Sequence, residues 1–190
     1  MNRRFVGFLL LTALLAAPAS GQRAARTAAG PGLTLTSPAF ADCAIIPKKF
    51  TADAAGTPVS PPLEWTHVPP GTVTFALLLE DPDTAMRESP VEVLHWMIFN
   101  IPGADRSLPE GVPNVARLPD GATQGKNTRG FPGFMGPAAP PAGPYHHYLF
   151  QLYALNTKLD LGPDATRAEV LKAMAGHVLG KGVMVGRFHR

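Results

Sequence analysis

Cysteine is almost absent from this sequence, and charged side chains are scarce. The 190 residues include one cysteine, and Asp, Glu, Lys and Arg together make up 16%. A single cysteine excludes an internal disulfide, so Cys43 is either buried and inert or a free thiol through which two copies form a homodimer. Of these two states we expect the buried one.

The sequence also lacks an apolar run long enough to span a bilayer. The apolar stretch near the N-terminus, from Phe5 to Ala17, falls short of the roughly 20 residues that a spanning helix needs. Arg3 and Arg4 precede this stretch, and small residues follow it. These features are typical of a secretory signal peptide. We therefore expect a signal peptide over residues 1–20, a periplasmic or secreted protein, and at most peripheral contact with a membrane.

An excess of charge of one sign is missing once the signal peptide is set aside. The whole chain carries 17 basic and 14 acidic side chains, and residues 1–20 contain two of the arginines and none of the acids. The remainder is nearly neutral, whereas nucleic-acid binding needs a concentrated basic surface. We expect no nucleic-acid partner.

Proline and glycine, by contrast, are abundant. The 21 prolines and 19 glycines lie between apolar runs instead of forming one tract, and apolar residues make up 45% of the chain. This pattern is typical of short strands joined by rigid turns around one core. Because the sequence has no internal repeat and no second composition block, we predict a flexible leader over residues 21–32 and one domain over residues 33–190.

Four stretches have the patterns of strands. Leu33–Ser37 alternates apolar and polar residues, as a half-buried strand does. In Val73–Glu80 the odd-numbered residues form one apolar face, and Asp81 continues that face at the strand end. Leu94–Ile101 and Tyr148–Leu155 are apolar on both faces, which indicates central strands of a sheet that is covered on both sides.

A long loop and one helix complete the pattern. Residues 102–144 are rich in proline, glycine and asparagine, and a loop of this length in a compact domain is usually functional. Thr166 and Glu169 form a capping box. The helix that follows has an apolar stripe: Val170, Leu171, Met174 and Val178. We predict that it ends near Gly180 and that Val183–Val185 is a short strand or an extended tail.

Polar residues mark the ends of the predicted strands. Asp81 closes one strand, His95 lies at the start of the next, and His146 and Tyr148 open a third. Because His146 and Tyr148 are two residues apart they share one strand face, and His147 faces the other side. Taken singly, each of these residues is more typical of a core side chain whose hydrogen bonds are satisfied within the fold. Together they predict a small polar pocket, in which the imidazoles and the phenol donate hydrogen bonds to an anion and Asp81 holds a neighbouring imidazole protonated.

Five short motifs occur in an order that carries a family resemblance. They are Ser60–Trp65, Asp81-Pro82-Asp83, His95-Trp96 with Asn100-Ile101-Pro102, Gly136-Pro137 with Pro140-Pro141, and His146-His147-Tyr148 with Leu152–Leu155. In this order and spacing, from about Leu33 to Arg190, the chain resembles the phosphatidylethanolamine-binding protein family, in its bacterial branch of Raf kinase inhibitor-like proteins.

The resemblance implies a mainly β fold, a sandwich of two antiparallel sheets with a C-terminal α-helix and a long Pro/Gly-rich loop. It also implies a pocket for phosphate, acetate or a phospholipid head group. The implied ligand-binding residues are the side chains of Asp81, His95, His146 and Tyr148 and the backbone amides at Gly136. On this basis we expect a non-enzymatic binding protein for a small anionic or phosphorylated ligand, without a cofactor.

Two alternatives stay open on the residues alone. Asp81 and His95 are an acid–base pair of the kind that a hydrolase uses on a phospho- or acyl-substrate, although the sequence has no evident nucleophile motif. His95, His146 and Asp81 are also a two-histidine, one-carboxylate set of the kind that binds a metal ion.

The N-terminal assignment predicts a shortened mature protein. We expect exported material to begin between Ala19 and Gln22, because signal peptidase cleaves after small residues. Mass spectrometry of the intact exported protein measures this start directly. Exported protein that still carries Met1 or Asn2 would contradict the assignment.

Overall fold

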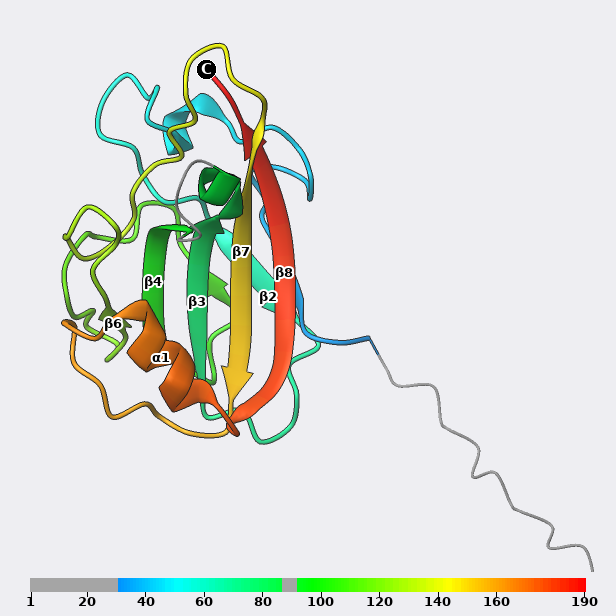
Figure 1. Cartoon of the computed structure of the whole chain (residues 1–190). Coiled ribbons are helices and arrows are strands. Elements are labelled where there is room, and N and C mark those ends of the chain that lie inside the picture. The colour runs from blue at the N-terminus through cyan, green and yellow to red at the C-terminus, as the bar shows by residue number, and fades with distance from the viewer. Residues whose placement is uncertain (1–30, 87–91) are drawn as a thin grey trace, which may run out of the picture.

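The computed structural model describes residues 31–86 and 92–190, so the predicted signal peptide and most of the predicted leader lie outside the described residues. Figure 1 shows the arrangement of the elements. Strands are labelled β, the α-helix α and the short 3₁₀ helices η. In chain order the elements are β1 (Thr34–Thr36), η1 (Lys48–Phe50), β2 (Leu63–Thr66), β3 (Thr74–Asp81), η2 (Pro82–Met86), β4 (Val93–Pro102), β5 (Ser107–Leu108), β6 (Thr123–Gln124), β7 (His146–Leu155), α1 (Arg167–Met174) and β8 (Val178–Phe188).

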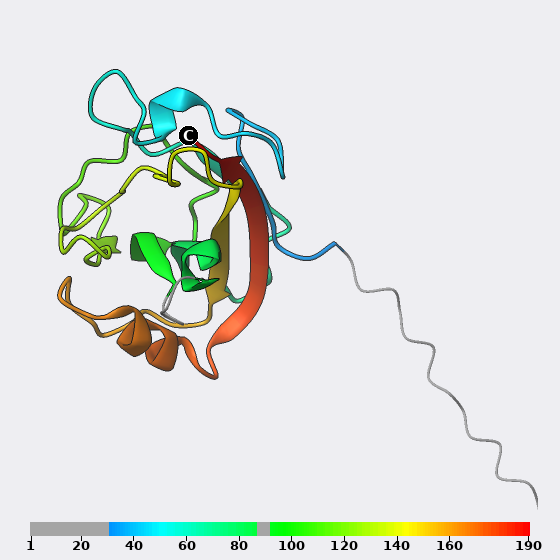
Figure 2. The ribbon, with the colours of Figure 1, turned by 45° about the horizontal axis from the view of Figure 1, so that its top comes forward.

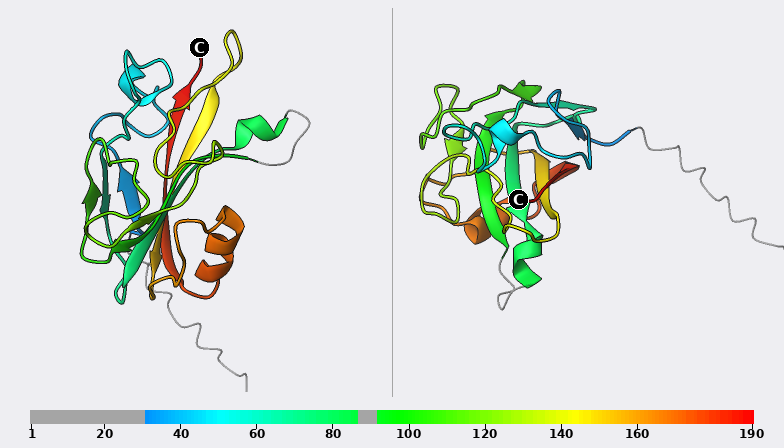
Figure 3. Two further views of the ribbon diagram at one scale, coloured as in Figure 1. Left: turned by 90° about the vertical axis from the view of Figure 1, so that its left-hand side faces the viewer. Right: turned by 90° about the horizontal axis from the view of Figure 1, so that it is seen from above.

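These strands form two antiparallel sheets. The smaller sheet has the order β1-β2-β5, and the larger has the order β6-β4-β3-β7-β8. Figure 3 shows the small sheet on one face of the large sheet and α1 on the other. The predicted β-sandwich with one helix and a long connecting loop is therefore confirmed. Within residues 31–86 and 92–190, no helix is long and apolar enough to cross a membrane.

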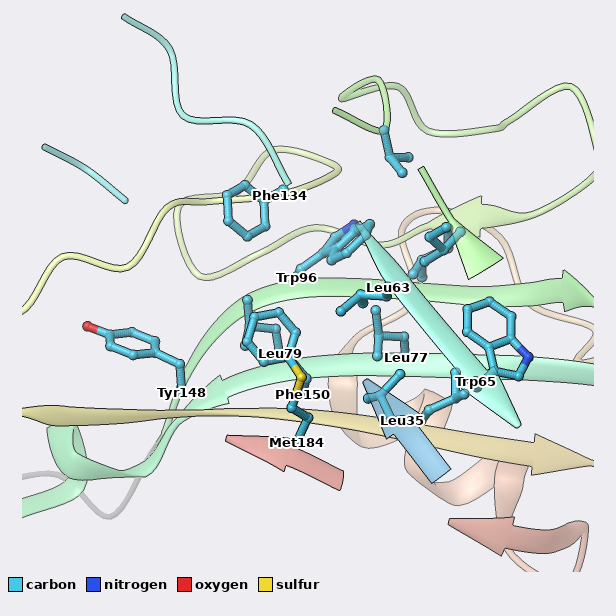
Figure 4. Close-up of a cluster of buried hydrophobic side chains, with 14 of the residues drawn as sticks. Leu35, Leu63, Trp65, Leu77, Leu79, Trp96, Phe134, Tyr148, Phe150 and Met184 are labelled. Carbon is cyan, nitrogen blue, oxygen red and sulfur yellow. The ribbon is translucent and has the colours of Figure 1, made fainter. Parts of the chain in front are cut away.

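Strand β3 is buried on both faces and separates two apolar cores. Phe75, Leu77 and Leu79 face the core between the sheets, which Figure 4 shows in close-up. Ala76 and Leu78 face a second core beneath α1. The predicted alternation therefore holds inside the strand. It fails at Val73, which precedes the strand and is half exposed.

Strand β4 departs from regular pairing at two points, and a polar residue lies at each. Its register with β3 shifts once at His95 and once at Asn100. Asn100 adopts a positive φ of 59°, which asparagine tolerates better than most residues. Its side chain bonds both backbone groups of Leu159, at 2.9 and 2.8 Å. Each shift is a β-bulge, which redirects the side chain of the extra residue.

The helix is shorter than the sequence pattern predicted, and the strand after it is longer. Helix α1 ends at Met174, because Gly176 adopts a φ of 81° and closes the C-terminus in the left-handed conformation. Val178 and Gly180, predicted to belong to the helix and its stop, belong instead to the 11-residue strand β8. Close packing explains the glycine at position 180, since a Cβ there would approach Pro69 Cγ to 2.8 Å.

The expectation that Cys43 is buried is wrong. The residue is exposed and lies in a tight turn with φ of 60°. Its backbone N–H donates to Val185 O at 2.7 Å, which fixes the turn against the edge of β8 and leaves the thiol in solvent.

The start of α1 tests the helix assignment. Thr166 Oγ1 accepts from the Glu169 N–H, and the Glu169 carboxylate accepts from the Thr166 N–H at 2.8 Å, so the predicted capping box is present. We expect Thr166→Ala to lower the free energy of unfolding by about 1 kcal/mol, because the cap is lost. Thermal melting measures this, with Thr57→Ala, an exposed threonine outside the helices and strands, as the control. An unchanged Thr166→Ala melt would mean that the cap contributes nothing.

Candidate functional site

The polar residues of interest meet at one end of the large sheet, where β3 and β8 end and β4 and β7 begin (Figure 2). Asp81 is the last residue of β3, and His146 is the first residue of β7. Asp81 Oδ2 lies 2.8 Å from His146 Nδ1, and the two side chains are only 3% and 6% exposed. The structure thus joins two of the predicted site residues in a buried carboxylate–imidazole pair.

The turn after β3 holds this pair in place. The Asp83 N–H donates to Asp81 Oδ1 at 3.0 Å, and Asp83 Oδ2 accepts from the backbone N–H of His147 at 2.6 Å. The same oxygen lies 2.9 Å from His147 Nδ1. The register between β3 and β7 ends at Leu149, so these side-chain contacts attach the start of β7 to the turn. The His147 side chain is half exposed and belongs to this outer contact.

His95 reaches the site from β4 because it is the extra residue of a bulge. The register passes from Leu79↔Trp96 to Glu80↔Leu94, which leaves His95 without a partner in β3. The bulge places its imidazole against the Tyr148 ring, edge to face at 5.2 Å between centroids. His95 is 3% exposed.

Two hydrogen bonds to one residue of the long loop fix His95. The Met135 N–H donates to His95 O at 2.8 Å, and His95 Nδ1 lies 2.9 Å from Met135 O. A carbonyl oxygen only accepts, so Nδ1 carries a proton. Burial is the main influence on this imidazole and lowers its pKa; the Met135 bond and Asp81 oppose that shift, and Arg129 and His146 add to it. His95 is therefore neutral at pH 7, and its Nε2 is an acceptor, contrary to the expectation that both imidazoles donate.

Tyr148 lies at the end of the core between the sheets. Figure 4 shows its ring beside the apolar cluster with the hydroxyl pointing away from the other labelled side chains. The ring also stacks on His146, at 6.5 Å between centroids. Oη is buried and makes no hydrogen bond of good geometry with the described residues; the Ala138 backbone and the Asp81 carboxylate lie only within reach of a weak, distorted one. Burial first, and then the charge of Asp81, raise the pKa of the Tyr148 hydroxyl above its usual range, so it keeps its proton.

Gly136 lies in the loop that contacts His95 and Tyr148. A Cβ at this position would come within 2.9 Å of Pro58 Cβ and 3.0 Å of the Ala52 nitrogen, so close packing requires a glycine. Ala52 N–H also donates to Pro137 O at 2.8 Å. These contacts explain the glycine as a packing residue. The expected role of the backbone amides at Gly136 in binding a ligand stays a prediction.

The geometry does not favour the two alternatives. The hydrolase hypothesis paired Asp81 with His95, but the imidazole hydrogen-bonded to Asp81 is that of His146. Among the described residues, no three His, Cys, Asp or Glu side chains are grouped closely enough to hold a metal ion.

Sequence reasoning missed two positions that shape the site. Asp83 had a signal, because it is the second carboxylate of the Asp81-Pro82-Asp83 motif, which follows a predicted strand. Met135 had none, because it acts through its backbone N–H and C=O, which every residue type except proline provides.

Comparison with known proteins identifies the relatives of this arrangement. A family model described as phosphatidylethanolamine-binding protein matches residues 36–189. A UPF0098 protein of Methanothermobacter thermautotrophicus is 46% identical over 159 residues, which cover 83% of this chain and 99% of that protein.

Two crystal structures share the fold. A phosphatidylethanolamine-binding protein homologue from Chlamydia trachomatis is 33% identical with a TM-score of 0.72, over 84% of this chain and 98% of that one. Escherichia coli YbcL, described as a member of the mammalian family, is 27% identical with a TM-score of 0.76, over 84% and 99%. Since the family model spans nearly all of the described residues, this chain belongs to the phosphatidylethanolamine-binding protein family.

Proposed function

We propose that this chain is an exported, non-enzymatic binding protein that holds a small anion, either phosphate or a phospholipid head group. The proposed anion site consists of Asp81, His95, His146 and Tyr148. Membership of a family named for binding supports a binding role. The N-terminal sequence supports export, because residues 1–20 have the pattern of a signal peptide.

The observation that carries the proposal is the buried hydroxyl of Tyr148. Its Oη makes no hydrogen bond with the described residues. A buried polar group that lacks a partner costs about 1–3 kcal/mol, and native proteins rarely leave one unexplained. A ligand oxygen that accepts from Oη would satisfy it. Because its raised pKa keeps the hydroxyl protonated, the donor is available at any physiological pH.

The surrounding groups suit a small polar ligand. The Nε2 atoms of His95 and His146 make no hydrogen bond with the described residues, since each ring uses Nδ1 for its internal contact. Two imidazole nitrogens and one phenol oxygen thus remain for a ligand.

Calorimetry tests the proposed function directly. Phosphate or phosphoethanolamine is titrated into the exported protein, and we expect saturable binding at millimolar ligand or below. A folded sample that gives no binding heat with either compound would rule out the anion site.

The Tyr148 hydroxyl should affect affinity and stability in opposite ways. We expect Tyr148→Phe to weaken phosphate binding by roughly tenfold, because a donor to a charged oxygen is lost. Without ligand, the same change should leave the free energy of unfolding equal or higher, since it removes an unpaired buried group. Calorimetry and denaturant unfolding measure the two effects. A clear loss of stability without ligand would show that the hydroxyl already has a partner.

The effect of replacing each of the three histidines should depend on whether its side chain lies in the site or on the outside. We expect His95→Ala or His146→Ala to weaken phosphate binding by about tenfold or more, because each removes a side chain of the site. His147→Ala is the matched control and should leave affinity nearly unchanged, because its side chain contacts Asp83 on the outside. If His147→Ala abolished binding and His146→Ala did not, the assigned site would be wrong.

A further inference from the structure

The hydrogen bond between His95 and Met135 determines what His95 offers to a ligand. His95 Nδ1 lies 2.9 Å from Met135 O, and the Met135 N–H returns a bond to His95 O, so the ring is held from both sides. Because the carbonyl accepts only, the proton of the neutral ring is on Nδ1. The Nε2 atom then carries a lone pair, and a ligand atom facing it must supply a hydrogen.

The charged neighbours of His95 do not reverse this assignment. Asp81 and the Met135 carbonyl favour the protonated ring, whereas burial, Arg129 and His146 disfavour it, and burial is the largest of these influences. The Tyr148 ring, edge to face with the imidazole, adds no charge.

The two imidazoles of the site therefore differ in chemistry. His146 Nδ1 contacts the carboxylate of Asp81 at 2.8 Å, so this ring faces a negatively charged acceptor. His95 Nδ1 contacts a neutral carbonyl. The site thus offers Tyr148 Oη as a donor and His95 Nε2 as an acceptor within one small cluster.

We propose that the anion site selects oxyanions that carry their own hydrogen-bond donor, with hydrogen phosphate as the type, over oxyanions that carry none, such as sulfate. This inference rests on the proposed function. Inorganic phosphate keeps at least one P–OH group at neutral pH, and that group donates to His95 Nε2 while an unprotonated oxygen accepts from Tyr148. Sulfate has the same shape but no proton, so one of its oxygens would face the lone pair of Nε2.

Competition between phosphate and sulfate tests the inference. At about pH 7.5 we expect the exported protein to bind phosphate roughly tenfold or more tightly than sulfate. In the sulfate complex His95 Nε2 is covered but has no donor to accept from, and this lost hydrogen bond weakens binding. The preference should fall once the pH is low enough to protonate His95, because the protonated ring donates to either anion; burial lowers the pKa of His95, so this happens below the usual range for an imidazole. Equal affinities at the higher pH would overturn the inference.

Two variants assign the preference to one side chain. His95→Ala should bring the two affinities to within about threefold, because the acceptor is gone. His146→Ala is the matched control within the site and should weaken both anions while keeping most of the preference. If the preference survives His95→Ala and disappears in His146→Ala, the acceptor is on His146 and the assignment to His95 is wrong.

An NMR measurement without ligand separates this inference from the proposed function. The ¹⁵N shifts of His95 should show a protonated Nδ1 and an unprotonated Nε2 at about pH 7.5. If His95 instead carries its proton on Nε2, the inference fails even where phosphate binds. If the wild-type protein binds neither anion, the proposed function fails, and the selectivity proposed from it fails as well.

Discussion

The pairing of β3 with β7 is the constraint on which the rest of this site depends. The register runs from Thr74↔Leu155 to Glu80↔Leu149 without a break, so the side-chain faces of the two strands stay in phase over their shared length. That phase places Asp81 and His146 on one face at one end. Beyond Leu149 the ladder stops, and the contacts of Asp81 and Asp83 with β7 continue it. A slip of one residue would move His147 inward and separate the buried pair.

The site is an extension of the apolar core between the sheets. Tyr148, Phe150 and Leu152 lie on one face of β7, and all three are buried in that core. The ring of Tyr148 belongs to the core, and its hydroxyl points away from the other labelled side chains (Figure 4). Burial of the ring therefore fixes the position of the donor, which explains how a hydroxyl with no hydrogen bond to the described residues is still held in place.

Alternation along the strands predicted much of this arrangement, because a regular ladder allows little choice. The shared face of His146 and Tyr148, and the position of Asp81 on the face of Leu79, both follow from it. The bulge at His95 could not be predicted in this way, since an extra residue leaves no mark on an apolar strand. The end of α1 was missed for a related reason. Gly176 and Gly180 are both plausible stops, and only the φ of 81° at Gly176 separates them.

A carboxylate inside the proposed anion site requires a physical explanation, because like charges repel. Both oxygens of Asp81 are already engaged, Oδ1 by the Asp83 N–H at 3.0 Å and Oδ2 by His146 at 2.8 Å. A carboxylate that is bonded in this way orients its neighbours instead of binding the ligand. It holds His146 through Nδ1, and its charge adds to burial, the larger cause, in raising the pKa of the Tyr148 hydroxyl. In the proposed anion site, Asp81 thus orients its neighbours, and ligand binding is assigned to Tyr148, His146 and His95.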